Sequence, residues 1–242
     1  MKIRILAILL FFTLLPISVR AGEAEETMRK IRAGWEAVDE ESQVHAVTVT
    51  GSGRSGLPQE FTLWQAWKTT GQDLARIKFT GPRHMEGIQL LTEGERQWLR
   101  SPPFKVRPVR FDKGEGGTEF AQTAFTHEDL RSLDLQTYRY AVEGNKLIAT
   151  PAKVGESAYS RLELLVDRSR WVITEIRYFD MKGVQVKTLT NSGWQEACPG
   201  IWRPRSIQMV NIVTGRRTDV TVTYKGFQRL PGRVFSPAEL NK

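Results

Sequence analysis

A long series of short segments with alternating apolar and polar residues limits this chain to an antiparallel β architecture. The segments are 45–50, 61–69, 74–79, 88–92, 97–100, 137–142, 146–150, 160–166, 172–179, 184–190, 205–213 and 219–227. A period of two places successive side chains on opposite faces of a strand. Because the links between the segments are short, neighbouring strands are expected to be antiparallel. The pattern predicts a mainly β domain with one meander sheet of about eleven to twelve strands.

The links themselves have the composition of tight turns. "TTGQD", "TEGER", "VEGNK", "DMKGV" and "VTGRR" each contain a glycine between two strand segments. Glycine adopts the positive φ that a tight reversal requires without a steric penalty. These links therefore predict β-hairpins.

The two faces of the expected sheet differ in polarity. In segment 160–166, Leu162 and Leu164 alternate with charged residues, and in segment 219–227, Val220 and Val222 do the same. The right-handed twist of so many strands curls the sheet. We expect an open half-barrel whose apolar face is concave and whose other face is solvated. Periodicity identifies the apolar face, but it leaves open whether that face borders a cavity or a closed core.

Two segments have helical character. Residues 27–40 carry Met28, Ile31, Trp35 and Val38 at near-helical spacing. The second segment, "TAFTHEDLRSLD" at 123–134, predicts a short helix that lies over the sheet as a lid. Thr126 is placed to cap it with Asp129 at the third helical position, and Phe125 with Leu130 forms a hydrophobic staple.

The histidine and acidic residues of 123–134 also suggest an alternative, a metal or acid/base site. The other histidines, His45 and His84, stand apart in the sequence, and no H-E-x-x-H pattern is present. "GSGRSG" at 51–56 lacks the lysine of a phosphate loop, and Cys198 has no histidine near it in sequence. We therefore expect no catalytic residue, metal or cofactor, and no enzymatic activity.

The first residues resemble a secretory leader. Lys2 and Arg4 precede an apolar run, and Val19-Arg20-Ala21 provides small residues at alternate positions. We expect cleavage after Ala21, which gives a signal peptide at 1–21 and a single domain at 22–242. Gly22 stands where a lipidated protein has cysteine, so the expected product is exported, unanchored and without a transmembrane segment; the family resemblance given below implies that it is periplasmic.

The charge of the chain bears on its possible binding partners, and its cysteine content bears on disulfide bonds. The chain has a net charge of +8, and loss of Lys2, Arg4 and Arg20 with the leader lowers it by three. Cys198 is the only cysteine, so no internal disulfide is expected. The basic stretch 100–117 is expected to be a solvated loop. Its alternative role is contact with lipid headgroups or an acidic partner through Arg100, Lys105, Arg107 and Arg110.

Several stretches together resemble a known family. "ARIKFTGPRHMEGIQLL", "FTHEDL", "YSRLELLVDRSRWVITEIRYFDMKGVQVKTL", "IWRPRSIQMVNIVTGRRTDVTV" and "FSPAEL" occur in the order and spacing of the outer-membrane lipoprotein-sorting proteins, relatives of the periplasmic carrier LolA. The resemblance runs from about residue 60 to the end of the chain. It implies an open half-barrel of antiparallel strands with helices as a lid over a hydrophobic cavity.

The resemblance also implies a function, the carriage of lipoprotein acyl chains or lipid to the outer membrane. The partners would be that cargo and an inner-membrane transporter or permease, and nucleic acid is not expected. The alternative is a non-carrier envelope accessory or sensor that docks on a transporter. The apolar face predicts a cavity lined by Phe61, Leu63, Trp67, Ile77, Phe79, Leu90, Trp98, Tyr140, Leu162, Leu164, Ile176, Tyr178, Val220, Val222 and Tyr224. The predicted lid residues are Phe125, Leu130 and Leu133.

Overall fold

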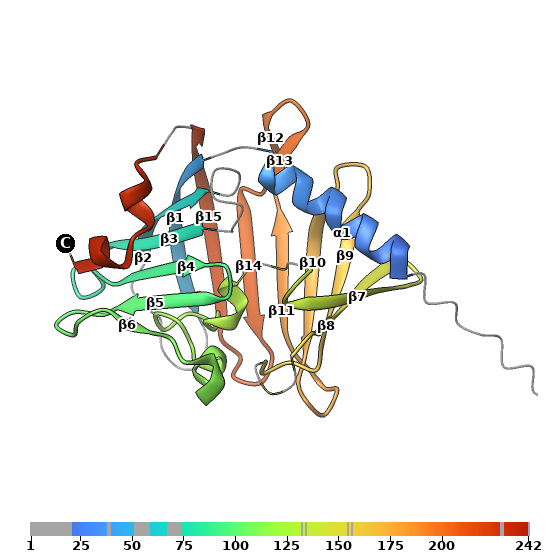
Figure 1. Ribbon diagram of the computed structural model, residues 1–242, viewed down its shortest axis with the longest axis horizontal. Helices are drawn as coiled ribbons and strands as arrows, with labels where there is room; N and C mark the ends of the chain where they lie inside the picture. Colours follow the sequence, from blue (N-terminus) through green and yellow to red (C-terminus); the bar gives the residue numbers. More distant parts are fainter. Residues whose placement is uncertain are drawn as a thin grey trace, which may run out of the picture.

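Figure 1 shows the computed structural model of the chain, which describes residues 21–37, 40–50, 59–66, 74–131, 133, 135–153, 155, 157–227 and 230–241. Residues 1–20 of the expected leader and the predicted turn at 69–73 lie outside the described residues, as does the glycine-rich stretch 51–56. No helix in the described part is long and apolar enough to cross a membrane.

One large antiparallel sheet dominates the described residues. Thirteen strands follow the order β6-β5-β4-β3-β2-β1-β15-β14-β11-β10-β9-β8-β7, and β12 and β13 form a separate pair. The strand bounds are β1 Glu40–Thr50, β2 Gln59–Ala66, β3 Leu74–Gly81, β4 Gln89–Glu93, β5 Arg96–Arg100, β6 Arg107–Pro108, β7 Tyr138–Glu143, β8 Lys146–Pro151, β9 Arg161–Asp167, β10 Val172–Phe179, β11 Gln185–Ser192, β12 Gln195–Cys198, β13 Ile201–Arg203, β14 Ser206–Asn211 and β15 Arg217–Phe227. Because β6 and β7 are the two edges, the sheet is open, which confirms the predicted half-barrel.

The hairpin turns have the predicted geometry. Gly183 joins β10 to β11 with φ of 76°, and Gly215 joins β14 to β15 with φ of 67°. The alternation along β15 also matches burial, since Thr218, Val220 and Val222 are buried while Arg217 and Thr221 are exposed. Local sequence therefore determines both the reversals and the inward face.

The helix α1 (Ala21–Glu36) packs across β7 and β10, and Figure 1 shows it lying over that half of the sheet. It begins at Ala21, before the predicted start at residue 27, and ends at Glu36. Ala24, Met28 and Ile31 are fully buried against the sheet in one cluster with Leu162 and Leu164. The helix thus fills the concave face over one half of the sheet.

The connection from β6 to β7 crosses the same face from one edge of the sheet to the other. It contains the short turns η1 (Phe111–Lys113), η2 (Glu115–Gly117) and η3 (Glu128–Leu130). The predicted lid helix is therefore a single 3-10 turn, and residues 118–133 are called the lid below. Phe120 of the lid packs with Ile77, Phe79 and Leu90 over the other half of the sheet.

The expectation that the outer face is solvated is wrong over β3 to β5. The C-terminal segment, with η4 (Gly232–Phe235) and η5 (Pro237–Asn241), packs Leu230, Phe235 and Leu240 on Leu91 of that face. Arg76 of β3 donates from Nη1 to the Val234 carbonyl at 3.0 Å. The last residues of the chain therefore cover apolar residues that alternate with the inward ones.

Candidate functional site: an apolar cavity under the lid

A cavity of about 360 Å³ lies between the inward face of the sheet and the lid. Ligand sites in proteins have volumes of about 300–1,000 Å³, so this space is large enough for a ligand. Most of the lining is apolar. From α1 and the sheet come Trp35, Val47, Phe61, Leu63, Leu74, Ile77, Phe79, Leu162, Ile173, Ile176, Leu189, Ile207 and Val220, and from the lid come Phe120, Phe125, Leu130 and Leu133.

Many of the residues proposed from sequence are among this lining. They are Phe61, Leu63, Ile77, Phe79, Leu162, Ile176, Tyr178 and Val220 on the sheet, with Phe125, Leu130 and Leu133 on the lid. They come from β2, β3, β9, β10, β15 and the lid, which are separated by up to 159 positions in sequence. The open curvature of the sheet brings them together.

Other proposed residues lie outside the cavity lining. Tyr140 and Leu164 are packed against α1, Leu90 lies with Phe79 and Met85, and Val222 lies with Val47. Each belongs to a packed core cluster. These positions have the expected alternation, but neighbouring side chains fill the space in front of them.

Three aromatic residues proposed for the cavity lining remain. Two of them lie elsewhere in the fold, and the third is outside the described residues. Trp98 packs with Leu91 and Phe235 under the C-terminal segment. The ring of Tyr224 contacts Phe227 edge to face, with centroids 5.2 Å apart. Trp67 lies outside the described residues. Trp98 pairs with Leu91 across β4 and β5, which places both on the outer face.

The lid is attached to the sheet by a buried ion pair. Lys187 of β11 donates from Nζ to Asp129 Oδ2 at 2.7 Å, and the two side chains are 5% and 0% exposed. The Tyr159 hydroxyl donates to the other carboxylate oxygen at 2.7 Å. Thr126 N–H also donates to Asp129 at 2.7 Å, and Asp129 N–H returns a longer bond of 3.4 Å to the Thr126 hydroxyl. The predicted Thr126–Asp129 pairing is present, although η3 starts at Glu128.

Hydrogen bonds at two further points fix the lid across the width of the sheet. Ala124 N–H donates to the hydroxyl of Thr218 on β15 at 2.8 Å. Gln97 of β5 donates from its amide nitrogen to the His127 carbonyl at 3.1 Å. The lid is therefore held by polar bonds above a space with a mostly apolar lining. The sequence did not indicate these partners, because polar strand residues were assigned to the solvated face.

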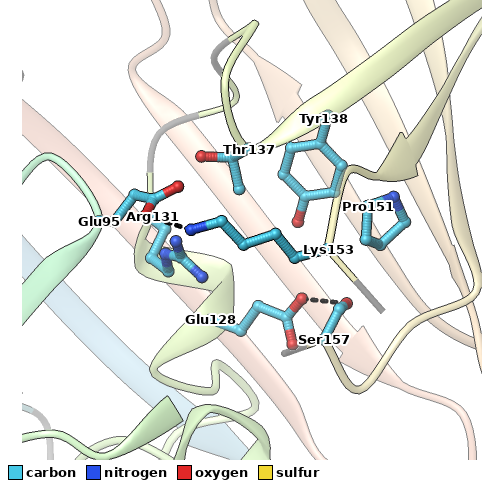
Figure 2. Close-up of a pocket in the computed structure, with 8 residues that line it drawn as sticks. All are labelled: Glu95, Glu128, Arg131, Thr137, Tyr138, Pro151, Lys153 and Ser157. Carbon is cyan, nitrogen blue, oxygen red and sulfur yellow. Dashed lines mark hydrogen bonds and ion pairs between the residues drawn. The ribbon is translucent and has the colours of Figure 1, made fainter. Parts of the chain in front are cut away.

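Glu128 connects the lid to the loop between β8 and β9. Its carboxylate accepts hydrogen bonds from the Ser157 hydroxyl and from Ala158 N–H. Burial raises the pKa of this carboxyl, and the two hydrogen bonds act in the opposite direction. Figure 2 shows Glu128 and Ser157 beside a second pocket, in which Lys153 pairs with Glu95 at 2.8 Å. That pocket has a volume of only about 10 Å³, room for a single water.

The three chemically suggestive side chains of the lid thus have separate contacts. His127 packs edge to face on Phe120, Glu128 bonds to Ser157, and Asp129 pairs with Lys187. In the described part of the chain, no group of three or more His, Cys, Asp or Glu residues could hold a metal ion. The contacts of these side chains join the lid to the rest of the fold.

Burial affects two histidines near the cavity. His45 lines the cavity and stacks on Phe61, with centroids 4.7 Å apart. Desolvation lowers the pKa of His45 from 6.5 to about 4. It also lowers the pKa of His127 to about 4, with a smaller contribution in the same direction from Arg107. Both imidazoles are therefore neutral at pH 7.

Acidification is expected to destabilise the fold between pH 6.5 and pH 4. The unfolded chain binds a proton at His45 near 6.5 whereas the native chain does so only near 4, so lowering the pH through this window favours unfolding. Thermal unfolding at a series of pH values should show the loss, and His45→Phe, which keeps the stack on Phe61, should reduce it. The raised pKa of Glu128 opposes the trend in part. An identical profile for the parent and His45→Phe would contradict this assignment.

The basic residues proposed for headgroup contact lie on the β5–β6 side of the molecule. Arg100 donates to the Gly87 carbonyl at 2.9 Å, and Arg107 pairs with Glu115 at 2.8 Å. Arg110 N–H donates to the same glutamate at 3.0 Å, and Lys105 is exposed. Arg107 and Arg110 thus share Glu115 as a partner within the loop.

Comparisons with known proteins agree with this architecture. A family profile with the description "Uncharacterized protein" matches residues 71–242. No curated protein matches the sequence. An outer membrane lipoprotein-sorting protein domain from Vibrio parahaemolyticus is similar over 92% of this chain and 100% of its own, at 19% identity and a TM-score of 0.81.

Two further solved structures are similar. A DUF1329 family protein from Desulfovibrio piger matches 91% of this chain and 98% of its own, at 19% identity and a TM-score of 0.82. A LolA superfamily protein from Nitrosomonas europaea matches 88% of this chain and 97% of its own, at 15% identity and a TM-score of 0.68. At such identities the similarity establishes the fold. The chain belongs to the family whose profile matches residues 71–242, and its fold is that of the LolA-like lipoprotein-sorting proteins.

Proposed function

We propose that this protein is a periplasmic carrier that holds the acyl chains of a lipoprotein or lipid in the cavity under the lid and transfers them to the outer membrane. The observation that carries the proposal is the apolar cavity of about 360 Å³ between the sheet and a lid attached by polar bonds. Export by a leader at 1–21 is part of the proposal.

The physical basis is the hydrophobic effect. Each methylene that leaves water contributes about 0.8 kcal/mol, so an acyl chain leaves a bilayer only for a similarly dry environment. The rings and aliphatic side chains of Phe61, Leu63 and Ile207 provide that environment. Since the same term applies in both places, the difference between bilayer and cavity is small and the cargo is able to return to a membrane.

The lid contacts give a reason for reversible access. Besides the apolar packing of Phe120, polar bonds at Asp129, Glu128 and Ala124 attach the lid. Polar bonds exchange with water at a modest net cost, about 0.5–1.5 kcal/mol for a typical hydrogen bond. The lid is therefore suited to open when cargo enters or leaves.

Transfer between vesicles tests the proposal. Donor vesicles containing a pyrene-labelled acyl lipid are mixed with unlabelled acceptor vesicles, and the loss of pyrene excimer emission reports transfer. We expect the rate to rise in proportion to protein concentration. Thr221→Glu, which adds a charge on the exposed face of β15, serves as the matched control and should transfer like the parent. If the parent binds neither lipid nor vesicles and gives no acceleration, the accessory or sensor role becomes the better account.

A further inference from the structure

Two neighbouring hairpin tips expose large aliphatic side chains that the cavity does not use. At the β10–β11 tip, Met181 and Val184 are 67% and 57% exposed; at the β14–β15 tip, Ile212 and Val213 are 52% and 75% exposed. Isolated exposed apolar residues are common on protein surfaces, but a contiguous group is associated with a binding surface. These four side chains belong to two adjacent turns and therefore call for an explanation.

The tips lie side by side at one end of the sheet. β11 and β14 are paired with Lys187 opposite Asn211, and Ile212 N–H donates to the Val186 carbonyl at 2.8 Å. Figure 1 shows both turns projecting in the same direction, at the lower edge of the view. The four aliphatic side chains therefore belong to one protruding edge, which we call the tip pair (residues 180–184 and 212–216).

Side-chain hydrogen bonds hold each turn in a defined shape. Asp180 Oδ1 accepts Lys182 N–H and Val184 N–H, each at 2.9 Å. Asn211 Oδ1 accepts Val213 N–H and Thr214 N–H, each at 3.0 Å. The turns are thus closed by their own polar side chains, and the aliphatic side chains are presented outward on an ordered backbone.

Basic side chains lie beside the aliphatic ones at the tip pair. Lys182 is exposed on the first tip, near Asp180, whose Oδ1 is occupied by backbone donors, and Arg216 on the second tip is paired with Glu119. Arg217 is half exposed and pairs with Asp219 beside it. Aliphatic side chains flanked by lysine and arginine fit the boundary of an anionic bilayer, where the former enter the acyl region and the latter contact phosphate.

The composition of the tips favours a bilayer over a protein partner. Protein interfaces concentrate their binding energy in aromatic residues and arginine within well-packed pockets. The tips have the sequences "DMKGV" and "NIVTGR", with flexible or branched aliphatic side chains and no aromatic residue. Such side chains insert between lipids without requiring a complementary pocket.

The second tip is also connected directly to the lid. Arg216 forms an ion pair with Glu119, and Thr218, two residues further along β15, accepts the hydrogen bond from Ala124 N–H. The Arg216 side chain is 17% exposed in this pair. A membrane bound at the tip pair is therefore adjacent to two of the contacts that hold the lid.

From this arrangement we propose that the tip pair is a docking surface for anionic lipid bilayers. Met181, Val184, Ile212 and Val213 enter the membrane boundary, and Lys182 contacts lipid phosphate. The proposal goes beyond carriage of cargo, because it assigns the surface that contacts the membrane and does not depend on what occupies the cavity.

Flotation with protein-free vesicles tests the assignment. The parent should bind vesicles of phosphatidylcholine mixed with phosphatidylglycerol more strongly than vesicles of phosphatidylcholine alone. The double variant Met181→Ser, Val213→Ser should lower the partition coefficient about tenfold or more because it removes inserted apolar groups. Lys182→Glu should lower it about fivefold or more, and the effect should shrink in high salt.

Leu135→Ser provides the matched control. Leu135 is 42% exposed between the lid and β7, so its replacement removes an exposed apolar side chain from another part of the surface. We expect this variant to bind vesicles like the parent. An equal loss for Leu135→Ser would overturn the assignment to the tip pair, since it would indicate general surface hydrophobicity.

Two more outcomes would overturn the proposal. One is a parent protein that does not float with anionic vesicles. The other is a double variant that binds protein-free vesicles normally but fails to bind vesicles made from native inner membrane, which would make the partner a membrane protein. Binding of a soluble fluorescent fatty acid should be unchanged in the double variant, so failure of docking is distinguishable from failure of the carrier function.

Discussion

Replacing Lys187 with alanine is expected to lower the free energy of unfolding by about 3–5 kcal/mol. The substitution leaves the fully buried carboxylate of Asp129 without its ammonium partner, and among the described residues the hydrogen bonds from Tyr159 and Thr126 remain to stabilise the charge. An unpaired buried charge costs much more than a lost surface contact. Urea unfolding at pH 7 measures the change.

A partly exposed ion pair on the neighbouring strand provides the control. Arg177 pairs with Glu175 on β10 at 2.5 Å, with side chains 35% and 25% exposed. Arg177→Ala should therefore cost only about 0–1 kcal/mol. The double variant Lys187→Met, Asp129→Leu should recover most of the stability lost in Lys187→Ala, because it removes both charges. If Lys187→Ala cost no more than Arg177→Ala, the buried attachment of the lid would be refuted.

Most of the sheet could be predicted from the sequence, because the alternation of the strands and the composition of the turns depend on neighbouring residues. Alternation along 219–227 and the glycines at 183 and 215 depend only on neighbouring residues, and they match the inward face of β15 and the two turns. Two motifs quoted for the resemblance, the acidic pair at 128–129 and Lys187, meet in the structure as the buried ion pair. Asp129 and Lys187 are 58 positions apart in the sequence, so no local pattern indicates this contact.

What could not be predicted depends on long-range packing. The residues around Trp98 alternate in polarity as in a strand, but this alternation does not show which face is inward. A shift of one residue in register exchanges the two faces of a strand. Only the pairing with β4 shows that Trp98 faces outward. The C-terminal segment 230–241 has no strand or helix period because it consists of short 3-10 turns, so its role as a cover over Leu91 was not visible. Leu164 faces inward as expected, but α1 occupies the space before it.

The cavity and the packed core are expected to respond differently to the same charge. Ile207 lines the cavity and is partly exposed, so a glutamate there reaches water in the unliganded protein and is desolvated only when cargo enters. Ile207→Glu should leave the protein folded and weaken acyl binding by about a hundredfold or more, which corresponds to several kcal/mol for an unpaired buried charge.

Leu164 provides the contrast. It is fully buried in the cluster with Met28 and Ile31, away from the cavity lining. Leu164→Glu should unfold the chain, since the cost of burying an unpaired charge there is a large part of a total stability of about 5–15 kcal/mol. Thr221→Glu on the exposed face should change neither folding nor binding. Circular dichroism separates loss of fold from loss of binding in all three variants.

The most direct test of the central claim is a titration of the delipidated parent protein with a fluorescent fatty-acyl ligand, alongside Ile207→Glu. We predict saturable binding near one ligand per protein, displacement by unlabelled phospholipid or lipopeptide, and loss of binding in the folded Ile207→Glu variant. No saturable binding by the parent, or undiminished binding by folded Ile207→Glu, would contradict the assignment of the cavity as the acyl-chain site.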